Sequence, residues 1–168
     1  VDLKRGQGME VAAMLDRYSR TVQRLSEERP DVRLVHITLP VRTSQGSWRT
    51  SVKRMLGMDI PADADNSLRN EFNEELRKRY KNQPLFDLAA LESTHPDGSR
   101  SLISYNGQTV YTLPREYTKD GGHLNEQAQR TIAAEFLRTL AATIGDSSTA
   151  QLSSARGTSV WALRPMVV

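Results

Sequence analysis

Asp120 and His123 are the two residues whose types and spacing are best suited to chemistry. They are separated by Gly121 and Gly122 and lie just before a predicted helix. Two adjacent glycines permit backbone angles that other residues avoid, so the carboxylate and the imidazole can lie side by side. An imidazole oriented by a carboxylate is the general-base half of a hydrolytic triad. The same letters are also typical of an ordinary loop and helix entry in which Asp120 is a cap, and this alternative stays open.

The other two histidines are weaker candidates. His36 lies within a run of apolar and β-branched residues, so we expect a buried histidine with satisfied hydrogen bonds. His95 lies in a turn-rich stretch, and we expect it to be solvated. Three scattered histidines argue against a histidine-rich metal site. The chain has no cysteine, which excludes disulfides, thiol catalysis and cysteine-ligated zinc.

Acidic residues gather before the second predicted helix, at Asp59, Asp63 and Asp65. We expect them to cap that helix and to oppose its positive end, with a weak calcium site as the alternative. No glycine-rich phosphate-binding loop of the Walker or Rossmann type occurs in the sequence. Nucleotide chemistry is therefore not supported.

The composition is that of one globular domain of 168 residues. Its 23 basic and 20 acidic residues are interspersed, which argues against a nucleic-acid partner because such a surface gathers Lys and Arg on one face. No apolar run approaches the roughly 18 residues that span a bilayer. A cysteine-free chain suits either redox setting, so the compartment stays open.

The predicted elements alternate helix and strand. Apolar residues recur at spacings of three and four over 9–28, which predicts a helix. The β-branched run 32–39, closed by Pro40, predicts a buried parallel strand, so that helix and strand form half of a βαβ unit. An irregular connection follows over 41–64, with a short helix at 50–56. Loops after parallel strands are where α/β proteins place ligands.

A second helix is predicted from a cap at 65–67 to Tyr80, followed by a brief strand at 84–88. Residues 101–105 and 109–113 are expected to pair as a hairpin across Asn106-Gly107. The last helix is expected to start at Glu126 and to end near Ile144, with Gly145 as its cap. We therefore divide the chain into a domain over 1–144 and a polar Ser/Thr/Ala-rich tail over 145–168.

Several of these segments together resemble the C-terminal part of an SGNH (GDSL-type) hydrolase. The residues that carry the resemblance are 86–94 (Phe-Asp-Leu-Ala-Ala-Leu-Glu-Ser-Thr) and 117–125, followed by a helix. Asp120-Gly-Gly-His123 resembles the Asp-x-x-His block that supplies the acid and the base of the triad. The upstream pattern is similar to one SGNH subgroup, and it comprises Tyr18, the strand 34–40, Asp65, Asn66, Arg69, Phe72, Asn73 and Arg77.

The resemblance implies a fold, an activity and roles for two residues. The fold would be a three-layer α/β/α arrangement with a mostly parallel, flavodoxin-like sheet. The activity would be hydrolysis of acyl esters, including deacetylation of carbohydrate, without a metal or organic cofactor. His123 would be the general base and Asp120 the residue that orients it.

The family's nucleophile block is the main departure. Gly145-Asp146-Ser147 has matching letters, but it follows a helix instead of a strand, so we interpret Gly145 as a cap. The family's Gly-x-Asn-Asp block, which supplies oxyanion donors, is also missing. The fold is therefore expected to be incomplete at the N-terminus, with the nucleophilic serine outside this chain and the chain alone inactive.

An incomplete sheet has an unpaired edge, so we expect pairing with the missing N-terminal segment or self-association. The substrate would be a small-molecule or carbohydrate ester. The alternative function is that of a non-catalytic α/β binding or scaffold domain, in which Asp-Gly-Gly-His is a loop and helix cap.

Overall fold

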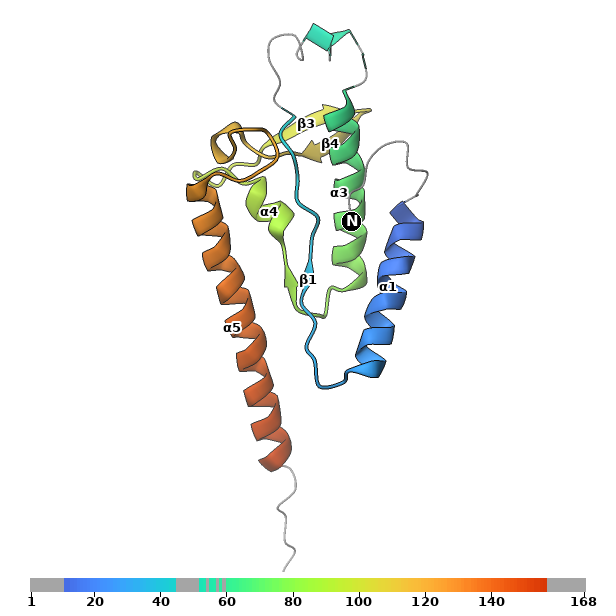
Figure 1. The fold of residues 1–168 in the computed structure, drawn as a ribbon, viewed down its shortest axis with the longest axis vertical. Coiled ribbons are helices and arrows are strands. Elements are labelled where there is room, and N and C mark those ends of the chain that lie inside the picture. The colour runs from blue at the N-terminus through green and yellow to red at the C-terminus, as the bar shows by residue number, and fades with distance from the viewer. Residues whose placement is uncertain (1–10, 45–51, 54, 57, 59, 157–168) are drawn as a thin grey trace, which may run out of the picture.

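The computed structural model describes residues 11–44, 52–53, 55–56, 58 and 60–156, and side chains up to residue 145. Within this part the chain is a mixture of helices and short strands in two small sheets (Figure 1). The sequence-based expectation of a mixed α/β protein is confirmed at this level.

Two helices that run in the same direction form the larger hydrophobic core. They are α1 (Val11–Glu28) and α3 (Pro61–Arg79), which lie side by side in Figure 1. The predicted helix over 9–28 is confirmed from residue 11 onward. The apolar faces of both helices meet because residues three and four apart share one side of a helix. The buried members of this core are Val11, Met14, Leu15, Phe72, Leu76 and Tyr80.

A parallel pair of strands lies next to this core. It consists of β1 (His36–Ile37) and β2 (Leu85–Phe86), and α3 forms the connection between them. These three elements form a βαβ unit, whereas the predicted one contains α1, and a strand before α1 would lie outside the described residues. Neighbouring side chains of a strand point to opposite faces. Accordingly, Leu85 packs against the α1–α3 core, whereas the Phe86 ring contacts Phe136 of α5 with ring centroids 5.0 Å apart.

Strand β1 is shorter than the predicted 32–39. Its continuation is extended, but the backbone of Leu39 pairs with a side chain of α3 instead of a strand. The Asn73 amide accepts a hydrogen bond from the Leu39 N–H (2.6 Å) and donates one to its carbonyl (2.9 Å). The side chain takes the place of a strand, so no ladder extends there.

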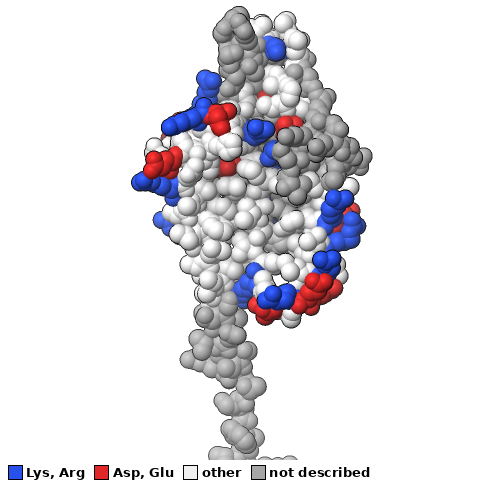
Figure 2. All heavy atoms as spheres, viewed as in Figure 1, with Lys and Arg blue, Asp and Glu red and all other residues white. Residues whose placement is uncertain are grey.

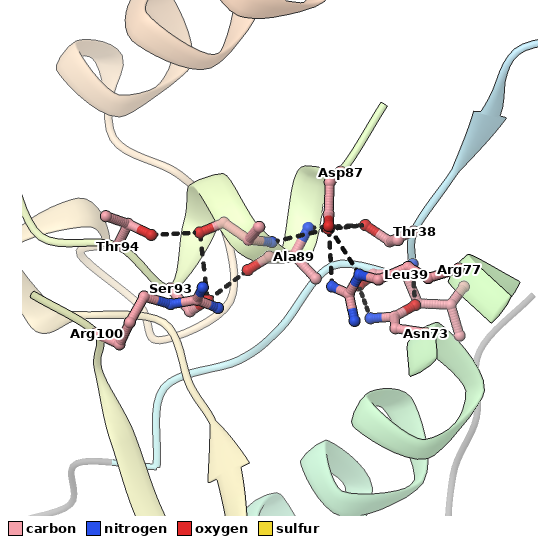
Figure 3. A network of polar contacts seen from close by, with 10 residues as sticks. Thr38, Leu39, Asn73, Arg77, Asp87, Ala89, Ser93, Thr94 and Arg100 are labelled. Carbon is pink, nitrogen blue, oxygen red and sulfur yellow. Dashed lines mark hydrogen bonds and ion pairs between the residues drawn. The ribbon is translucent and has the colours of Figure 1, made fainter. Parts of the chain in front are cut away.

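Strand β2 also ends earlier than predicted, because Asp87 is the N-cap of α4 (Leu88–Glu92) and accepts a hydrogen bond from the Ala90 N–H. Arg77 of α3 forms a two-pronged ion pair with the same carboxylate, at 2.7 and 2.8 Å. Thr38 donates a fourth hydrogen bond to it. Figure 3 shows how this network joins α3, the end of β1 and the start of α4.

The predicted hairpin is confirmed as β3 (Leu102–Tyr105) and β4 (Gln108–Tyr111). Asn106 and Gly107 both have positive φ, at 49° and 76°, as a two-residue turn of this kind requires. The second strand ends at Tyr111 instead of 113. There its N–H and carbonyl bind the side-chain amide of Asn70, which attaches the hairpin to α3.

The predicted cap at 65–67 is wrong, because α3 begins at Pro61. Proline suits the first turn of a helix, since its missing N–H would have no partner there. Asp63 lies in this first turn, where its charge opposes the positive end as expected. Asp65 is inside the helix and does not cap it. Asp59 lies outside the described residues, as does part of the short helix predicted at 50–56.

The last helix, α5, extends over Glu126–Arg156 and passes through Gly145 without a break. The predicted end near Ile144 and the glycine cap are therefore wrong. A glycine inside a helix costs only about 1 kcal/mol, and the Ser, Thr and Ala residues that follow do not interrupt a helix. The division into a domain and a tail stays a prediction, and 157–168 lie outside the described residues. No helix in the described part is long and apolar enough to cross a membrane.

Candidate functional site

The loop that carries Asp120 and His123 closes on itself between a short 3-10 helix, η1 (Arg115–Tyr117), and α5. An isolated antiparallel bridge joins Thr118 to Leu124. The Asn125 N–H donates to the Tyr117 carbonyl at 2.7 Å. The loop residues between these contacts turn back at Gly121, which has a φ of 87°. A left-handed backbone at this point explains why glycine is required.

The structure brings the two predicted site residues into direct contact. His123 Nδ1 lies 2.5 Å from Asp120 Oδ2. Asp120 Oδ1 accepts hydrogen bonds from the N–H groups of Gly122 (3.0 Å) and His123 (2.8 Å). The hydrogen bond from the His123 side chain, followed by these two backbone donors, holds the pKa of Asp120 well below its usual range. The carboxylate is therefore ionised at neutral pH and orients the imidazole.

Both side chains are open to solvent. The His123 side chain is 90% exposed and that of Asp120 is 55% exposed. His123 Nε2 has no hydrogen-bond partner among the described residues, and no described serine hydroxyl contacts it. The imidazole is thus oriented on one side and available on the other, which is the geometry of a general base without its nucleophile.

The interpretation of Asp120 as a helix cap is wrong. The cap of α5 is Asn125, whose side-chain oxygen accepts a hydrogen bond from the Ala128 N–H at 3.0 Å. Asp120 binds N–H groups of its own loop instead, because the positive φ of Gly121 turns them toward the carboxylate.

The loop rests on the segment that follows β1. The Thr43 N–H donates to the Gly121 carbonyl at 3.0 Å. A Cβ atom at Gly121 would lie 2.7 Å from Thr43 Cγ2, closer than such atoms approach in proteins. At Gly122 a Cβ would lie 3.4 Å from the Arg42 guanidinium. Gly121 therefore allows a close approach to Thr43, whereas a Cβ atom at Gly122 would make only an ordinary contact with Arg42. Sequence reasoning assigned neither residue 42 nor residue 43 to the site.

Two buried asparagines of α3 hold that segment in turn. Asn73 binds the backbone of Leu39, as described above, and Asn66 binds that of Arg42 at its N–H (2.9 Å) and carbonyl (2.7 Å). An amide side chain that makes both bonds imitates a paired strand. The signal in the sequence is the spacing of seven, which puts Asn66 and Asn73 on one helix face amid apolar residues.

Glu92 is a third contributor that the sequence did not indicate. This carboxyl is 4% exposed and accepts the Val41 N–H at 2.7 Å. Burial raises its pKa to about 7, although the hydrogen bond from Val41 and the charge of Arg69 act in the opposite direction. Its protonation near neutral pH therefore takes place directly beside the segment that supports the loop.

The remaining histidines differ from one another. His36 is buried, with Nδ1 2.7 Å from the Tyr18 hydroxyl and Nε2 2.9 Å from Gln83 Oε1. This confirms the prediction of a satisfied core histidine. His95 is less solvated than predicted. That side chain is 26% exposed and its Nδ1 is paired with Glu116. The fold brings these two residues together across 21 positions, so no local pattern predicted the pair.

Two further expectations concern metal binding and the Gly145-Asp146-Ser147 letters. No group of three or more His, Asp or Glu residues in the described part of the chain is arranged to hold a metal ion. The backbone over 145–147 is helical, and this does not fit the strand-to-helix turn that presents a nucleophilic serine. Comparisons with protein-family models, curated proteins and solved structures find no match to this chain.

Proposed function

We propose that this chain is the acid–base part of a serine ester hydrolase of SGNH type. The observation that carries the proposal is the 2.5 Å contact between His123 Nδ1 and Asp120 Oδ2, with Nε2 left available. The loop's attachment to the segment after a parallel strand supports it, because α/β proteins place catalytic residues at that end of the sheet. On this proposal β1 and β2 belong to a larger three-layer α/β/α sheet.

The reaction follows from the orientation of the imidazole. His123 Nε2 takes the proton of a serine hydroxyl while the serine oxygen attacks the ester carbonyl. The resulting imidazolium is stabilised by the Asp120 carboxylate, and it then protonates the leaving alcohol. Water repeats the sequence on the acyl-enzyme and releases the acid. The serine and the oxyanion donors are supplied from outside this chain.

The test requires the complete gene product. We expect it to react with a fluorophosphonate probe and to hydrolyse p-nitrophenyl acetate. His123→Ala should lower kcat/KM by roughly three to four orders of magnitude, and Asp120→Asn by a similar factor. Lys119→Ala, in the same loop, should stay within about twofold of the wild type. The 168-residue chain by itself should give almost no turnover.

Equal rates for the wild type and His123→Ala would refute the assignment. A gene product without an upstream serine on a strand-to-helix turn would refute it as well.

A non-catalytic α/β binding or scaffold domain is the second candidate, favoured by the 90% exposure of the His123 side chain. An exposed imidazole is not yet in the water-poor surroundings in which general bases act best. If the complete protein reacts with neither reagent and the loop variants fold normally, this second function is the correct one.

A further inference from the structure

A pocket of about 280 Å³ lies between α5 and the end of α4, and its lining contains neither Asp120 nor His123. One wall is a single face of α5, and the opposite wall comes from Leu91 and the residues that follow α4. The α5 positions form two neighbouring rows with a spacing of four, as expected of one helix face: Gln127, Thr131 and Glu135 in one row, and Ala128 and Ile132 in the other. His95 and Tyr117 complete the lining.

The polar groups of this pocket are held in place before any ligand arrives. The Tyr117 hydroxyl donates to the Thr94 carbonyl at 2.8 Å, which fixes the ring against the segment after α4. Glu116 pairs with His95 Nδ1. The pKa of Glu116 lies below its usual value, first because the carboxylate accepts a hydrogen bond from the N–H of its own residue and also because it accepts one from the His95 side chain. Burial acts in the opposite direction but does not outweigh them. An ionised Glu116 therefore accepts a hydrogen bond from the Nδ1–H group of His95.

His95 Nε2 is then the free position of the imidazole, since no described residue forms a hydrogen bond with it. Depending on its protonation, this nitrogen accepts a hydrogen bond from a ligand hydroxyl or donates one to it. The Gln127 side-chain amide likewise has no partner in the described part of the chain. Two adaptable polar groups thus line one small cavity.

The lining also indicates which ligands do not fit. None of the described lining residues is Lys or Arg, Glu135 in the wall is already paired with Arg138, and Glu116 with His95, so an anion would find no unpaired cationic side chain among the described lining residues. The apolar lining at Leu91 and Ile132 is not continuous, because the polar side chains of Gln127 and Thr131 lie in the same walls. A long acyl chain would therefore bury polar groups without partners. The ligand that fits this lining is therefore a small, uncharged molecule with both an apolar face and hydroxyl groups.

We infer that this pocket binds a single uncharged sugar ring, with its hydroxyls on His95 and Gln127 and its carbon face on Leu91 and Ile132. The inference rests on the walls of the pocket and not on the proposed hydrolase activity.

The experiment is a titration of the ¹⁵N-labelled chain, followed by NMR, with methyl β-glucoside and methyl α-mannoside as uncharged probes. We expect saturable shifts at the amides of Thr94, His95, Gln127 and Thr131, with a dissociation constant in the millimolar range that is usual for one small ring. Glucuronate and octanoate at equal concentration should cause smaller shifts. His95→Ala should weaken the sugar's affinity by about tenfold.

Thr131→Trp should fill the pocket and abolish the shifts. Its control is Ala141→Trp, a tryptophan at an exposed position of α5 outside the lining, which should leave binding unchanged. Stronger binding of glucuronate or octanoate, shifts away from the pocket, or no response to either sugar at about 50 mM would each overturn the inference. Since these are binding measurements on this chain, they stand or fall separately from the hydrolysis tests.

Discussion

Gly121 is the residue on which the geometry of the Asp120–His123 pair depends most directly. It combines two separate requirements, a φ of 87° and the absence of a Cβ atom 2.7 Å from Thr43 Cγ2. Gly98 has nearly the same φ, 85°, but nothing lies within 4 Å of the position of its Cβ. Substituting alanine at Gly98 therefore tests the cost of the backbone angle alone, and the same substitution at Gly121 tests that cost together with the close packing.

We predict that Gly98→Ala costs about 1–2 kcal/mol, the price of a left-handed alanine, and that Gly121→Ala costs at least about 1 kcal/mol more. Urea denaturation of both variants measures the difference. NMR should also show that Gly121→Ala disturbs the amides of Gly122 and His123. Equal destabilisation by the two variants would mean that Thr43 moves aside and does not define the loop.

The pH response of the loop is a second prediction at this scale. The pKa of Asp120 lies well below that of an ordinary aspartate because His123 and two backbone N–H groups bind the carboxylate. A carboxyl group with a lowered folded-state pKa contributes stability above its unfolded pKa and loses it only as the pH falls toward the folded value. The Gly122 and His123 amide shifts linked to Asp120 should therefore change well below pH 3.8. A transition centred near pH 4 would contradict this.

At the scale of elements, α3 positions the site through amide side chains. Asn66, Asn70 and Asn73 each pair with both polar groups of one backbone residue, on the segment after β1 or at the end of β4. These pairs replace strand-to-strand hydrogen bonds with helix-to-strand ones. Such contacts make α3 the support for residues 39–43 and, through them, for the loop at Gly121.

We predict that Asn66→Ala destabilises the fold by about 2–4 kcal/mol, because it empties a fully buried position, removes the partner of the Arg42 N–H and leaves the Arg42 carbonyl with only the Leu113 N–H. The exposed Asn82→Ala is the matched control and should cost less than about 0.5 kcal/mol. Chemical denaturation compares the two. If Asn66→Ala lowers the free energy of unfolding by less than about 1 kcal/mol, water or another group replaces the hydrogen bonds of Asn66 with the Arg42 backbone.

At the scale of the whole molecule, stability should depend on the buried Glu92. Its folded pKa of about 7 lies above the 4.5 of a free glutamate. The folded state therefore binds the proton more tightly, and the contribution of this group to stability falls as the pH rises from about 4.5 to about 7. The full difference corresponds to at most about 3 kcal/mol.

Glu92→Gln should remove this part of the pH dependence, since an amide oxygen can still accept the Val41 N–H. We expect the stability of the variant relative to the wild type to increase between pH 5 and pH 8, as measured by denaturation at both values. The variant should be at least as stable as the wild type at pH 8. A constant difference between the two proteins at both values would refute a raised pKa.

The surface of the molecule bears on association. Basic and acidic side chains lie next to one another around the edges of the face in Figure 2, and the middle of that face is largely uncharged. Ile37 on β1 is 44% exposed, and Leu137 and Ile144 of α5 are 64% and 66% exposed. We expect sedimentation to show concentration-dependent self-association that the double variant Leu137→Gln, Ile144→Gln weakens. A monomer at all concentrations would contradict this prediction.

The sequence by itself determined the local features of this protein. Periodic apolar residues predicted α1, the Asn106-Gly107 turn predicted the β3–β4 hairpin, and the Asp-Gly-Gly-His spacing predicted the contact between Asp120 and His123. These features depend on residues close together in the chain, whose geometry follows from backbone angles and short spacings. Helix ends were less predictable, because a proline such as Pro61 can either precede a helix or begin it, and a glycine such as Gly145 can either end a helix or lie within it.

Only the tertiary structure decided the long-range features. Three contacts join residues that are 21 to 51 positions apart: the hydrogen bond of Asn66 with Arg42, that of Glu92 with Val41, and the His95–Glu116 pair. Polar residues such as these are ordinarily found at surfaces, so composition and periodicity do not mark them as partners. They meet because the helices pack around a short parallel sheet, and packing, not local preference, brings such groups together and shifts their pKa values.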